Sequence, residues 1–546
     1  MKSVMEHSFS RVPGVEIPRS SFDRSHGVKT TFDADYLVPI LVDDVVPGDT
    51  FNVNMQVFAR LTSPTVLPLM DNMYLETFFF FVPYRLVWEN WEKFCGAQDN
   101  PADSIDYTIP VVTGGSTYTG EGTLWDYFGL PLDNKAGAHL DPDDVTVSAL
   151  PFRAYSLIWN EWFRDQNLQD DLRVNIDDGP DTFTTHATSQ THSGQAVSGE
   201  LAKRGKRHDY FTSCLPWPQK GTAVDLPLGT TAEVAFTGSD NDEISVRDYG
   251  HATNLFGMDS AGGVNDNVLA DDSAGGSGTP NLIVDLSGAT AATINDLRLA
   301  FQTQRLLERD ARSGTRYNET ILAHFGVTVP DFRVQRPEFL GGGSHPINIS
   351  PVAQTTYQGT QTVEDAKGAL SGIGTVHGSS GFTKSFVEHG VVIGLVNVRG
   401  DITYSQGVER YWSKSTRYDF YYPVLSQIGE QSVTFAELWT QGDGATTDDT
   451  VFGYQERYAE MRYKPSRLTG LMSVEAASNL DEFHLSEDFA TQPSLDDTFI
   501  QSNTGSPLDR AISVPSQPHF VADFYIGMKC ARPMPLWGVP GNLDRF

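Results

Sequence analysis

The chain has 546 residues, of which 39% are hydrophobic and 11% aromatic, so disorder over most of its length is excluded. Its 70 acidic residues outnumber 39 basic ones, and the resulting net charge of −31 excludes a protein that binds DNA through its overall charge. Length alone suggests three or four domains, although large β-folds with long insertions depart from that rule. The 49 glycines and 30 prolines favour a loop-rich architecture.

The cysteines and the apolar segments of the sequence indicate the cellular compartment in which the protein is expected. Cys95, Cys214 and Cys530 are far apart, and none has the spacing of a zinc site or a disulfide framework. We therefore expect assembly in a reducing cytoplasm. Residues 1–20 lack the apolar segment of a secretory signal, and the densest apolar run, Phe78–Val82, is too short to span a bilayer, so we expect no membrane insertion.

Several segments have the pattern of β-strands. Apolar and polar residues alternate over Phe51–Val57 and Phe520–Met528, which predicts strands with one buried face. Met73–Val82 and Val391–Val398 are apolar on both faces, which predicts strands that are covered on both sides.

Helical patterns are fewer. Apolar residues recur with helical spacing over Pro151–Asp171, and a second helix is expected to begin near Thr293 and to end near Gly314. A third, short helix is expected over Arg316–Phe325. Strands near both ends of the chain favour a β-sandwich with elaborate loops over a βαβ fold. A jelly roll is one such sandwich, and the pattern does not separate it from the others.

Residues 219–291 differ in composition from their flanks. They are rich in Gly, Ala, Ser, Thr and Asp, contain no Trp, and hold eleven acidic residues against Lys220 and Arg247, a local net charge of −9. Ser273–Thr279 has the composition of a flexible surface tip, while Val234–Phe236 and Leu282–Leu286 could form short strands. We interpret the segment as an exposed insertion with little core of its own.

Long collinear blocks of the sequence resemble the major capsid proteins of the gokushovirus branch of the microvirus family. They begin with FDRSHGVKTTFDADYLVPILVDDVVPGDTF at Phe22–Phe51 and MDNMYLETFFFFVPYRLVWENWEKF at Met70–Phe94. The later blocks lie at Leu150–Gln169, Lys206–Gly221, Leu297–Glu319, His324–Gly342 and Glu456–Gly470. Residues 219–291 match poorly. In this family the corresponding segment is a large loop, and three copies of it form a protrusion at each threefold axis.

The resemblance implies an all-β fold: an eight-stranded viral jelly roll with long inserted loops and a few short helices. It divides the chain into an arm and the first part of the jelly roll (1–218), the surface insertion (219–291), and the rest of the jelly roll with an extended tail (292–546). It also implies a T=1 shell of sixty copies, with pentamers and threefold contacts, around a circular single-stranded DNA genome. The further implied partners are a small basic DNA-packaging protein, a pilot protein, an internal scaffolding protein and a host surface receptor, with assembly in the bacterial cytoplasm and no cofactor.

The densest basic patch directly precedes the insertion, and we expect it to contact genome phosphates on the inner wall of the shell. The alternative is ion pairing within or between subunits. The patch consists of Lys203, Arg204, Lys206 and Arg207.

A second basic series follows the insertion, with spacings of four, three and four that place it on one helical face. It could meet DNA or an acidic neighbouring subunit, and the i,i+4 spacing of Glu308 and Arg312 favours the interface. The series consists of Arg305, Arg309, Arg312 and Arg316, with Arg298 about two turns further towards the N-terminus.

Acidic residues of the insertion are candidates for a receptor contact, with a passive protrusion as the alternative. These candidates are Asp240, Asp242, Glu243, Asp271 and Asp272. Acidic runs also occur at Asp141–Asp144, Asp177–Asp181 and Asp240–Glu243. None has the EF-hand pattern of a calcium site, and we interpret them as solvated turns.

No catalytic motif supports an enzyme: GxSxG, the Walker A loop, HExxH and a helix-opening GxGxxG are all missing from the sequence. A turn would explain Gly341–Gly343. A free carbohydrate-binding or hydrolytic β-sandwich is the remaining alternative to a shell protein. The tryptophans near charged residues are expected to pack rather than to stack on bases. They are Trp159, Trp162, Trp217 and Trp537.

The two termini carry little periodicity. The prolines of the C-terminal tail, Arg532–Phe546, make it extended and poorly helical. We expect this tail and the N-terminal arm, Glu6–Tyr36, to reach over neighbouring subunits.

Overall fold

The computed structural model describes most of the chain. The described residues are 18–97, 100, 106–115, 117–132, 145–185, 195–222, 224, 233–236, 246–248, 268–270, 282–285, 294–312, 323–324, 335–355, 368–443, 447–501 and 507–537. The chain divides into two compact units, Met1–Pro218 with Val329–Phe546, and Gln219–Thr328.

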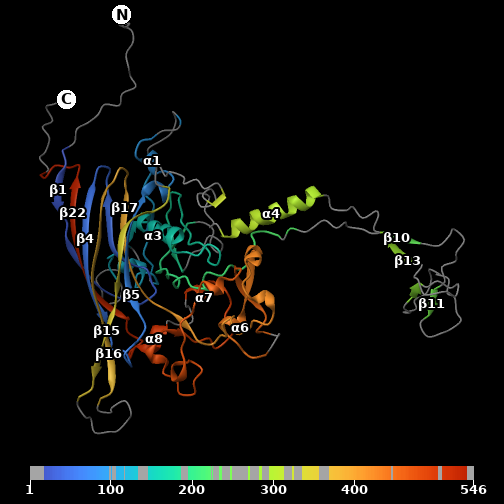
Figure 1. Ribbon diagram of the computed structural model, residues 1–546. Coiled ribbons are helices and arrows are strands. Elements are labelled where there is room, and N and C mark those ends of the chain that lie inside the picture. The colour runs from blue at the N-terminus through green and yellow to red at the C-terminus, as the bar shows by residue number, and fades with distance from the viewer. Residues whose placement is uncertain are drawn as a thin grey trace, which may run out of the picture. The chain divides into compact units, whose positions relative to one another are not determined.

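Two antiparallel sheets form the body of the first unit (Figure 1). The first sheet has the order β1-β22-β4-β16-β15, with β2 also paired to β22. Its strands are β1 (Ser20–Asp23), β2 (His26–Phe32), β22 (Phe520–Arg532), β4 (Thr50–Leu61), β16 (Leu370–Ser385) and β15 (Asn348–Ala353). The second sheet has the order β14-β5-β17-β3, with β14 (Glu338–Pro346), β5 (Met73–Pro83), β17 (Gly390–Gly400) and β3 (Val38–Val45).

This strand order is that of a jelly roll, because strands from both ends of the chain interleave in two facing antiparallel sheets. The expected all-β class is confirmed. The count of eight strands stays a prediction, since one edge is divided into β1 and β2, and β14 is followed after one residue by β15 in the other sheet. The pairing of Ser20–Phe32 with β22 makes this part of the expected arm an edge of its own chain's sheet.

The predicted strand faces are confirmed. In β4 the residues Phe51, Val53, Met55 and Val57 are buried and alternate with exposed polar residues. The same alternation runs along β22, whereas β17 is buried on both faces. The main hydrophobic core fills the space between the two sheets, where the rings of Phe79 and Phe382 are 5.3 Å apart, and continues under α3 (Leu150–Trp162).

The glycines Gly341–Gly343 lie inside β14, so the prediction of a turn is wrong. A Cβ on Gly342 would lie 2.1 Å from the backbone oxygen of Thr77 in β5. A Cβ on Gly341 would lie 2.8 Å from the backbone oxygen of Gly381 in β16. Close backbone approach between strands, rather than a turn conformation, therefore explains these glycines.

The helix α3 covers the face of the second sheet that is turned away from the first sheet, where Trp162 packs on Phe80. It begins with Pro151 in its first turn, as predicted, but it ends at Trp162 rather than near Asp171. Beyond it, the Asp165 carboxylate accepts the Asn167 N–H (2.9 Å), and the Asp165 N–H donates to the Gln169 side chain (2.8 Å). These local hydrogen bonds replace the helical ladder.

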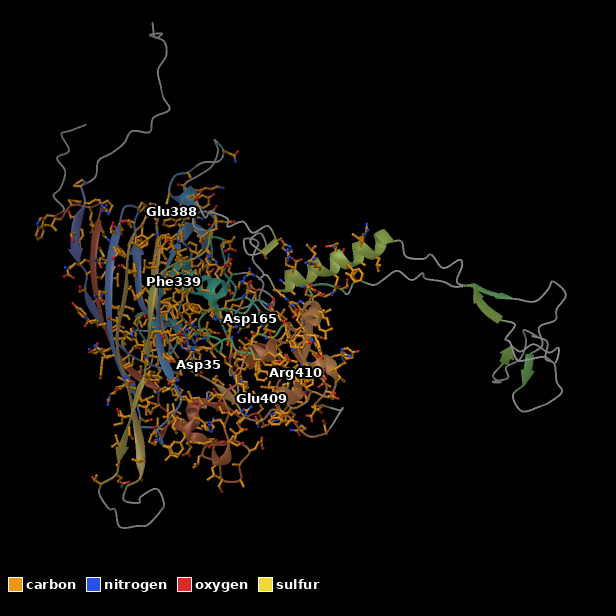
Figure 2. All side chains as sticks on the ribbon, in the orientation of Figure 1. Asp35, Asp165, Phe339, Glu388, Glu409 and Arg410 are labelled. Atoms are coloured by element: carbon orange, nitrogen blue, oxygen red, sulfur yellow. The ribbon has the colours of Figure 1, made fainter. Side chains whose placement is uncertain are left out.

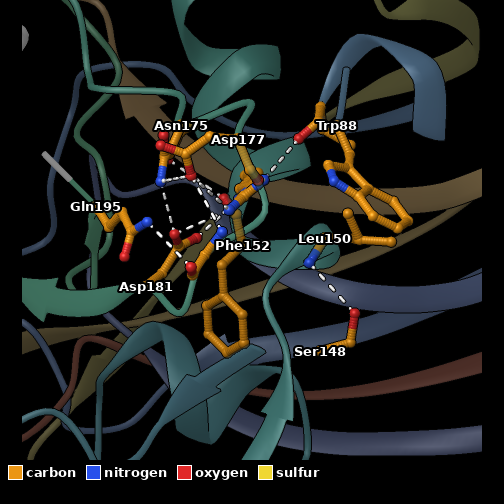
Figure 3. A network of polar contacts seen from close by, with 12 residues as sticks. Trp88, Ser148, Leu150, Phe152, Asn175, Asp177, Asp181 and Gln195 are labelled. Carbon is orange, nitrogen blue, oxygen red and sulfur yellow. Dashed lines mark hydrogen bonds and ion pairs between the residues drawn. The ribbon is translucent and has the colours of Figure 1, made fainter. Parts of the chain in front are cut away.

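A buried polar network ties α3 to the segment that follows it (Figure 3). Arg153 donates to both carboxylate oxygens of Asp181, at 2.7 and 2.8 Å, and both side chains are fully buried. The Asn175 amide donates to Asp181 and to Asp177, at 2.8 Å each. The prediction of a solvated turn at Asp177–Asp181 is therefore wrong for Asp181, whose charge is compensated by Arg153 inside the fold.

A smaller hydrophobic core lies in the first unit, outside the two large sheets. Phe211, Phe435, Phe452 and Phe499 meet in it, with the Phe452 and Phe499 rings 5.2 Å apart. Its elements are β18 (Thr403–Tyr404) parallel to β21 (Ser486–Glu487), β19 (Glu430–Thr434) antiparallel to β20 (Val451–Glu456), α6 (Phe435–Leu438) and α7 (Asp497–Gln501).

Short elements complete the first unit. They are α1 (Trp91–Phe94), α2 (Leu124–Tyr127), α8 (Pro507–Ala511), β6 (Val111–Thr113) paired with β7 (Thr146–Ser148), and β8 (Thr182–Thr184) paired with β9 (Ala196–Ser198). All three cysteines are unpaired; Cys95 is exposed, and Cys214 and Cys530 are buried. Within the described ranges, no helix is long and apolar enough to cross a bilayer.

The second unit begins at Gln219, the residue at which the composition of the chain changes, and extends to Thr328. The two segments expected as short strands are confirmed as β10 (Glu233–Phe236) and β13 (Leu282–Asp285), which pair with each other. β11 (Val246–Asp248) pairs with β12 (Val268–Ala270). The helix α4 (Ile294–Arg312) begins beside the predicted Thr293; Thr293, Gly314 and most of Arg316–Phe325 lie outside the described residues.

Candidate functional site

A cavity of about 740 Å³ lies on the α3 side of the second sheet, and we name it the basic cavity. Tyr74, Glu76, Phe78 and Phe80 of β5 line it together, because every second side chain of a strand points to the same face. The chain at 204–208 and Arg399 of β17 also line it. Arg399 lies beside Tyr74 in the register between β17 and β5.

Glu76 is the centre of the basic cavity. Its carboxylate accepts a hydrogen bond from Arg204, another from Arg399 at 3.0 Å, and a third from Arg207 at 3.4 Å. The side chain of Glu76 is only 13% exposed. Three guanidinium groups therefore share one buried carboxylate, and Asp401, at 3.2 Å, adds a second contact for Arg207 alone.

Aromatic rings contact two of these guanidinium groups. Arg204 lies over the Phe78 ring at 4.7 Å, and Arg207 lies over the Tyr74 ring at 4.5 Å. Such cation–π contacts strengthen when water is excluded. At the rim, Phe339 is 43% exposed, and Asp165 lies close by; both are labelled in Figure 2.

Lys206 and Lys203 are held differently. The Lys206 ammonium is 2.7 Å from Glu487 and over the Phe499 ring at 4.4 Å, and both charged side chains are less than 10% exposed. Lys203 lies over the ring of Tyr36 at 5.3 Å. Ion pairing within the chain, which was the alternative to a DNA contact, is thus present for Arg204, Lys206 and Arg207. The contact with DNA itself stays a prediction.

The lining of the cavity holds more basic than acidic side chains, and Glu487 and Asp401 pair with Lys206 and Arg207 from outside it. Five of its lining residues are Lys or Arg and two are acidic, in a chain whose net charge is −31. Burial lowers the pKa of Arg204 to about 10 and also lowers that of Arg399, whereas Arg204 and Arg399 lower the pKa of Glu76 against the opposing effect of its burial. The Nε–H groups of Arg207 and Arg399 are buried and have no acceptor among the described residues. Chemically, the arrangement can accept an anionic group next to exposed aromatic rings.

The second basic series lies in the other compact unit. Arg298, Arg305, Arg309 and Arg312 are all exposed on α4, whereas Arg316 lies outside the described residues. The candidate receptor residues also lie outside them. These are Asp240, Asp242, Glu243, Asp271 and Asp272.

The tryptophans support the packing interpretation where the structure gives them partners. Trp159 is buried and donates to the Lys203 carbonyl at 2.8 Å, and Trp162 donates to the Pro337 carbonyl at 2.8 Å. Trp537, by contrast, is 79% exposed.

Sequence reasoning missed the acidic partners of the basic patch, Glu76, Asp401 and Glu487, and the third guanidinium, Arg399. One signal could have found Glu76, since it is the only charged residue in the apolar run Met73–Val82. A charge in a strand that is covered on both sides requires a compensating partner.

Comparisons with known proteins cover both compact units. The chain matches the family described as Capsid protein (F protein) over residues 10–542. It is 43% identical to Capsid protein VP1 of Bdellovibrio phage phiMH2K over 558 residues, which covers 99% of this chain and 98% of that protein. It is 42% identical to Capsid protein VP1 of Chlamydia phage 1 over 600 residues, covering 99% and 98%. It is 33% identical to Capsid protein VP1 of Spiroplasma virus 4 over 555 residues, covering 98% and 97%.

Proposed function

Because this chain belongs to the Capsid protein (F protein) family of phages and is a structural protein rather than an enzyme, we propose that sixty copies form a T=1 icosahedral shell around a circular single-stranded DNA genome. The observation that carries the proposal is the match of almost the whole chain to proteins that are named capsid proteins. The jelly roll supports it physically, since two facing sheets make a rigid tile that can repeat in closed symmetry.

The mass of the assembled particle tests the shell. Sixty chains of 60.1 kDa give an empty shell of about 3.6 MDa. Expressed protein is separated by size-exclusion chromatography, and the largest species is weighed by native mass spectrometry and imaged by electron microscopy. We expect closed, uniform particles of that mass. A large assembly with a different number of subunits, or an open tube, would overturn the T=1 shell.

We propose that the basic cavity contacts genome phosphates. The basic side chains of its lining support the contact, and the exposed fraction of Arg207 (36%, against 16% for Arg204 and 12% for Arg399) supports Arg207 as the residue that reaches the ligand. Lys206 is unsuited to a test, because its removal would leave the Glu487 carboxylate buried without its cation.

The variant Arg207→Gln tests this contact in binding of oligo(dT) to purified subunits at several salt concentrations. Because oligo(dT) is single-stranded, losing one phosphate contact should lower the magnitude of the slope of log K against log salt by about 0.7. Arg24→Gln is the matched control, since Arg24 is 39% exposed and lies in an ion pair with Asp43, but does not line the basic cavity. Equal slopes for wild type and Arg207→Gln would remove the cavity as a phosphate site.

The remaining partners are proposals as well. The acidic total of the chain supports a separate small basic DNA-packaging protein that neutralises the genome, alongside a pilot protein and an internal scaffolding protein, with assembly in the bacterial cytoplasm. We propose that the acidic insertion, residues 219–291, meets the host surface receptor. Particles that carry a relative's segment in place of 219–291 should attach to that relative's host, and unchanged host attachment would contradict the role.

A further inference from the structure

An exposed row of aromatic and aliphatic side chains runs along residues 408–428, and we name it the aromatic strip. Trp412 is 67% exposed, Val424 86% and Ile428 58%. The strip borders a groove of about 870 Å³, with Met461 and Arg467 among the residues that line it. The other exposed aromatic residues of the strip are Tyr411, Tyr418, Phe420, Tyr421 and Tyr422. So many large exposed apolar side chains in one segment are typical of an interaction site.

Hydrogen bonds hold the strip in a defined shape. Arg457 donates to the Tyr418 carbonyl at 2.7 Å, and the hydroxyl of Tyr458 donates to the Phe420 carbonyl at 3.0 Å. The Asp419 carboxylate accepts from the backbone N–H of Thr416 at 2.7 Å and from its hydroxyl at 2.8 Å. The strip is therefore preorganised, which lowers the entropy that a partner must remove on binding.

The charge of this region is opposite to that of the chain. Residues 408–428 and 456–472 contain seven Lys and Arg against four Asp and Glu, a net charge of +3 within a chain of net charge −31. Lys414 lies over the Phe420 ring at 5.4 Å, and Arg417 lies over the Tyr422 ring at 5.7 Å. Among the described residues, neither has a carboxylate within ion-pair distance. Both cations can therefore meet acidic groups of a partner.

We propose that the aromatic strip is a contact between neighbouring copies of this chain, in which it docks on an acidic face of the next copy. Tyrosine, tryptophan and arginine, which the strip combines, are the residues that dominate binding at protein interfaces. The rest of each copy carries the opposite charge, which supplies the complementarity. The two surfaces differ, so the contact is heterologous, as ring closure in a shell requires.

Single-stranded DNA fits the same surface less well. Rings and cations would suit stacked bases and phosphates, but Val424, Ile428 and Leu471 are large exposed aliphatic side chains that stacking does not use. Burial against another protein explains both the rings and the aliphatic side chains.

The experiment compares two valines of equal exposure. Val424 lies in the strip, and Val387, 84% exposed, lies between β16 and β17. Because neither side chain is buried in the subunit, Val424→Asp and Val387→Asp should leave its circular dichroism and Tm unchanged. We expect Val424→Asp to lower the yield of assembled particles at least tenfold, and Val387→Asp to leave it within twofold. Trp412→Ser should repeat the loss without adding charge.

The inference rests on the proposed shell, and the outcomes separate the two. If the wild-type protein forms no closed particle, the proposed shell is overturned. The strip is then tested by light scattering, which compares the size of the oligomers formed by wild type with that of the oligomers formed by Val424→Asp. If wild type assembles and Val424→Asp and Trp412→Ser assemble equally well, the contact alone is overturned. If Val387→Asp lowers the particle yield as much as Val424→Asp does, the loss cannot be assigned to the strip and the proposed contact is overturned. If Val424→Asp and Trp412→Ser assemble normally but bind oligo(dT) more weakly, the strip is a DNA-binding surface and the proposed contact between copies is overturned.

Discussion

Arg153 and Asp181 form a two-point ion pair, with Nε–Oδ2 at 2.7 Å and Nη2–Oδ1 at 2.8 Å, in which neither side chain is exposed. Arg153 also donates to the carbonyls of Val87 and Asp177. One guanidinium thus joins α3 to the chain after β5 and to the segment that leads into β8 (Figure 3).

Breaking this pair should destabilise the subunit strongly. In Arg153→Met the Asp181 carboxylate stays buried without its cation, so the free energy of unfolding should fall by about 3–5 kcal/mol. Urea unfolding of purified subunits, followed by tryptophan fluorescence, measures it. The matched control is Lys29→Met, since Lys29 and Asp523 form an ion pair with side chains 77% and 50% exposed. That change should stay within about 1 kcal/mol, and equal effects at both pairs would contradict the argument.

Glu76 should make the free energy of unfolding of the subunit depend on pH in the acidic range. Its burial favours the neutral form, but Arg204 and Arg399 prevail and hold the pKa of Glu76 below the ordinary value of a glutamate. A carboxyl group whose pKa is lowered in the folded state stabilises the fold at pH values above its pKa in the unfolded chain. This stabilisation disappears as the pH falls through its pKa in the folded state. Glu76→Gln should therefore reduce the free energy of unfolding at pH 7, and the difference from wild type should narrow below about pH 4.

Urea unfolding of both proteins at pH 7 and at pH 3.5 measures this difference. Comparing the two proteins at each pH cancels the titration of all other carboxyl groups. A difference that stays constant between the two pH values would show that charge on Glu76 is not the cause.

Gly342 should not tolerate a methyl group. A Cβ there would lie 2.1 Å from the Thr77 backbone oxygen, and backbone cannot rotate away as a side chain can. Gly342→Ala should therefore cost about 1–3 kcal/mol or more and lower the Tm of the subunit. Gly120→Ala is the control, because no atom lies within 4 Å of its added Cβ. A Tm for Gly342→Ala that equals that of Gly120→Ala would contradict the close approach of β14 and β5.

The sequence was sufficient for the strands whose pattern is local. Alternation located the buried face of β4 at Phe51–Val57, and the continuous apolar run located β17. Pairing was not predictable in this way, because β22 lies between β4 and β2, more than 450 residues away in the chain. Such contacts depend on how two sheets share one core, and no short window of sequence carries that information. The three glycines of β14 were misread for the same reason.

The basic cavity shows the same limit at the level of single residues. A window of five residues was enough to recognise the basic patch at 203–207. Glu76, however, lies 128 residues from Arg204 and 323 residues from Arg399. Whether a cationic side chain has an acidic partner depends on which strand of the fold lies next to it, and that strand can be distant in sequence. Ion pairing was therefore only an alternative in the sequence, whereas the jelly roll places Glu76 and Arg399 on neighbouring strands.

The end of β22 suggests where the C-terminal tail can be shortened. Arg532 still belongs to its own subunit, since its guanidinium lies 3.3 Å from the buried carboxylate of Asp49 and donates to the Asp44 carbonyl at 2.7 Å. Beyond it, Met534, Leu536 and Trp537 are exposed apolar side chains. Deleting residues 534–546 should therefore leave a folded subunit of unchanged Tm but abolish particle assembly, because these side chains lose the neighbour that we expect them to cover.

Sedimentation of the truncated protein, with its Tm measured in parallel, tests this expectation. A deletion that also removed Arg532 would confuse the result, because Asp49 would then stay buried without its cation and the subunit itself would lose stability. Ending the chain at Pro533 separates assembly from folding. Normal particles from that truncated chain would show that the tail does not bind the neighbouring subunits, and a lowered Tm would show instead that the tail packs on its own subunit.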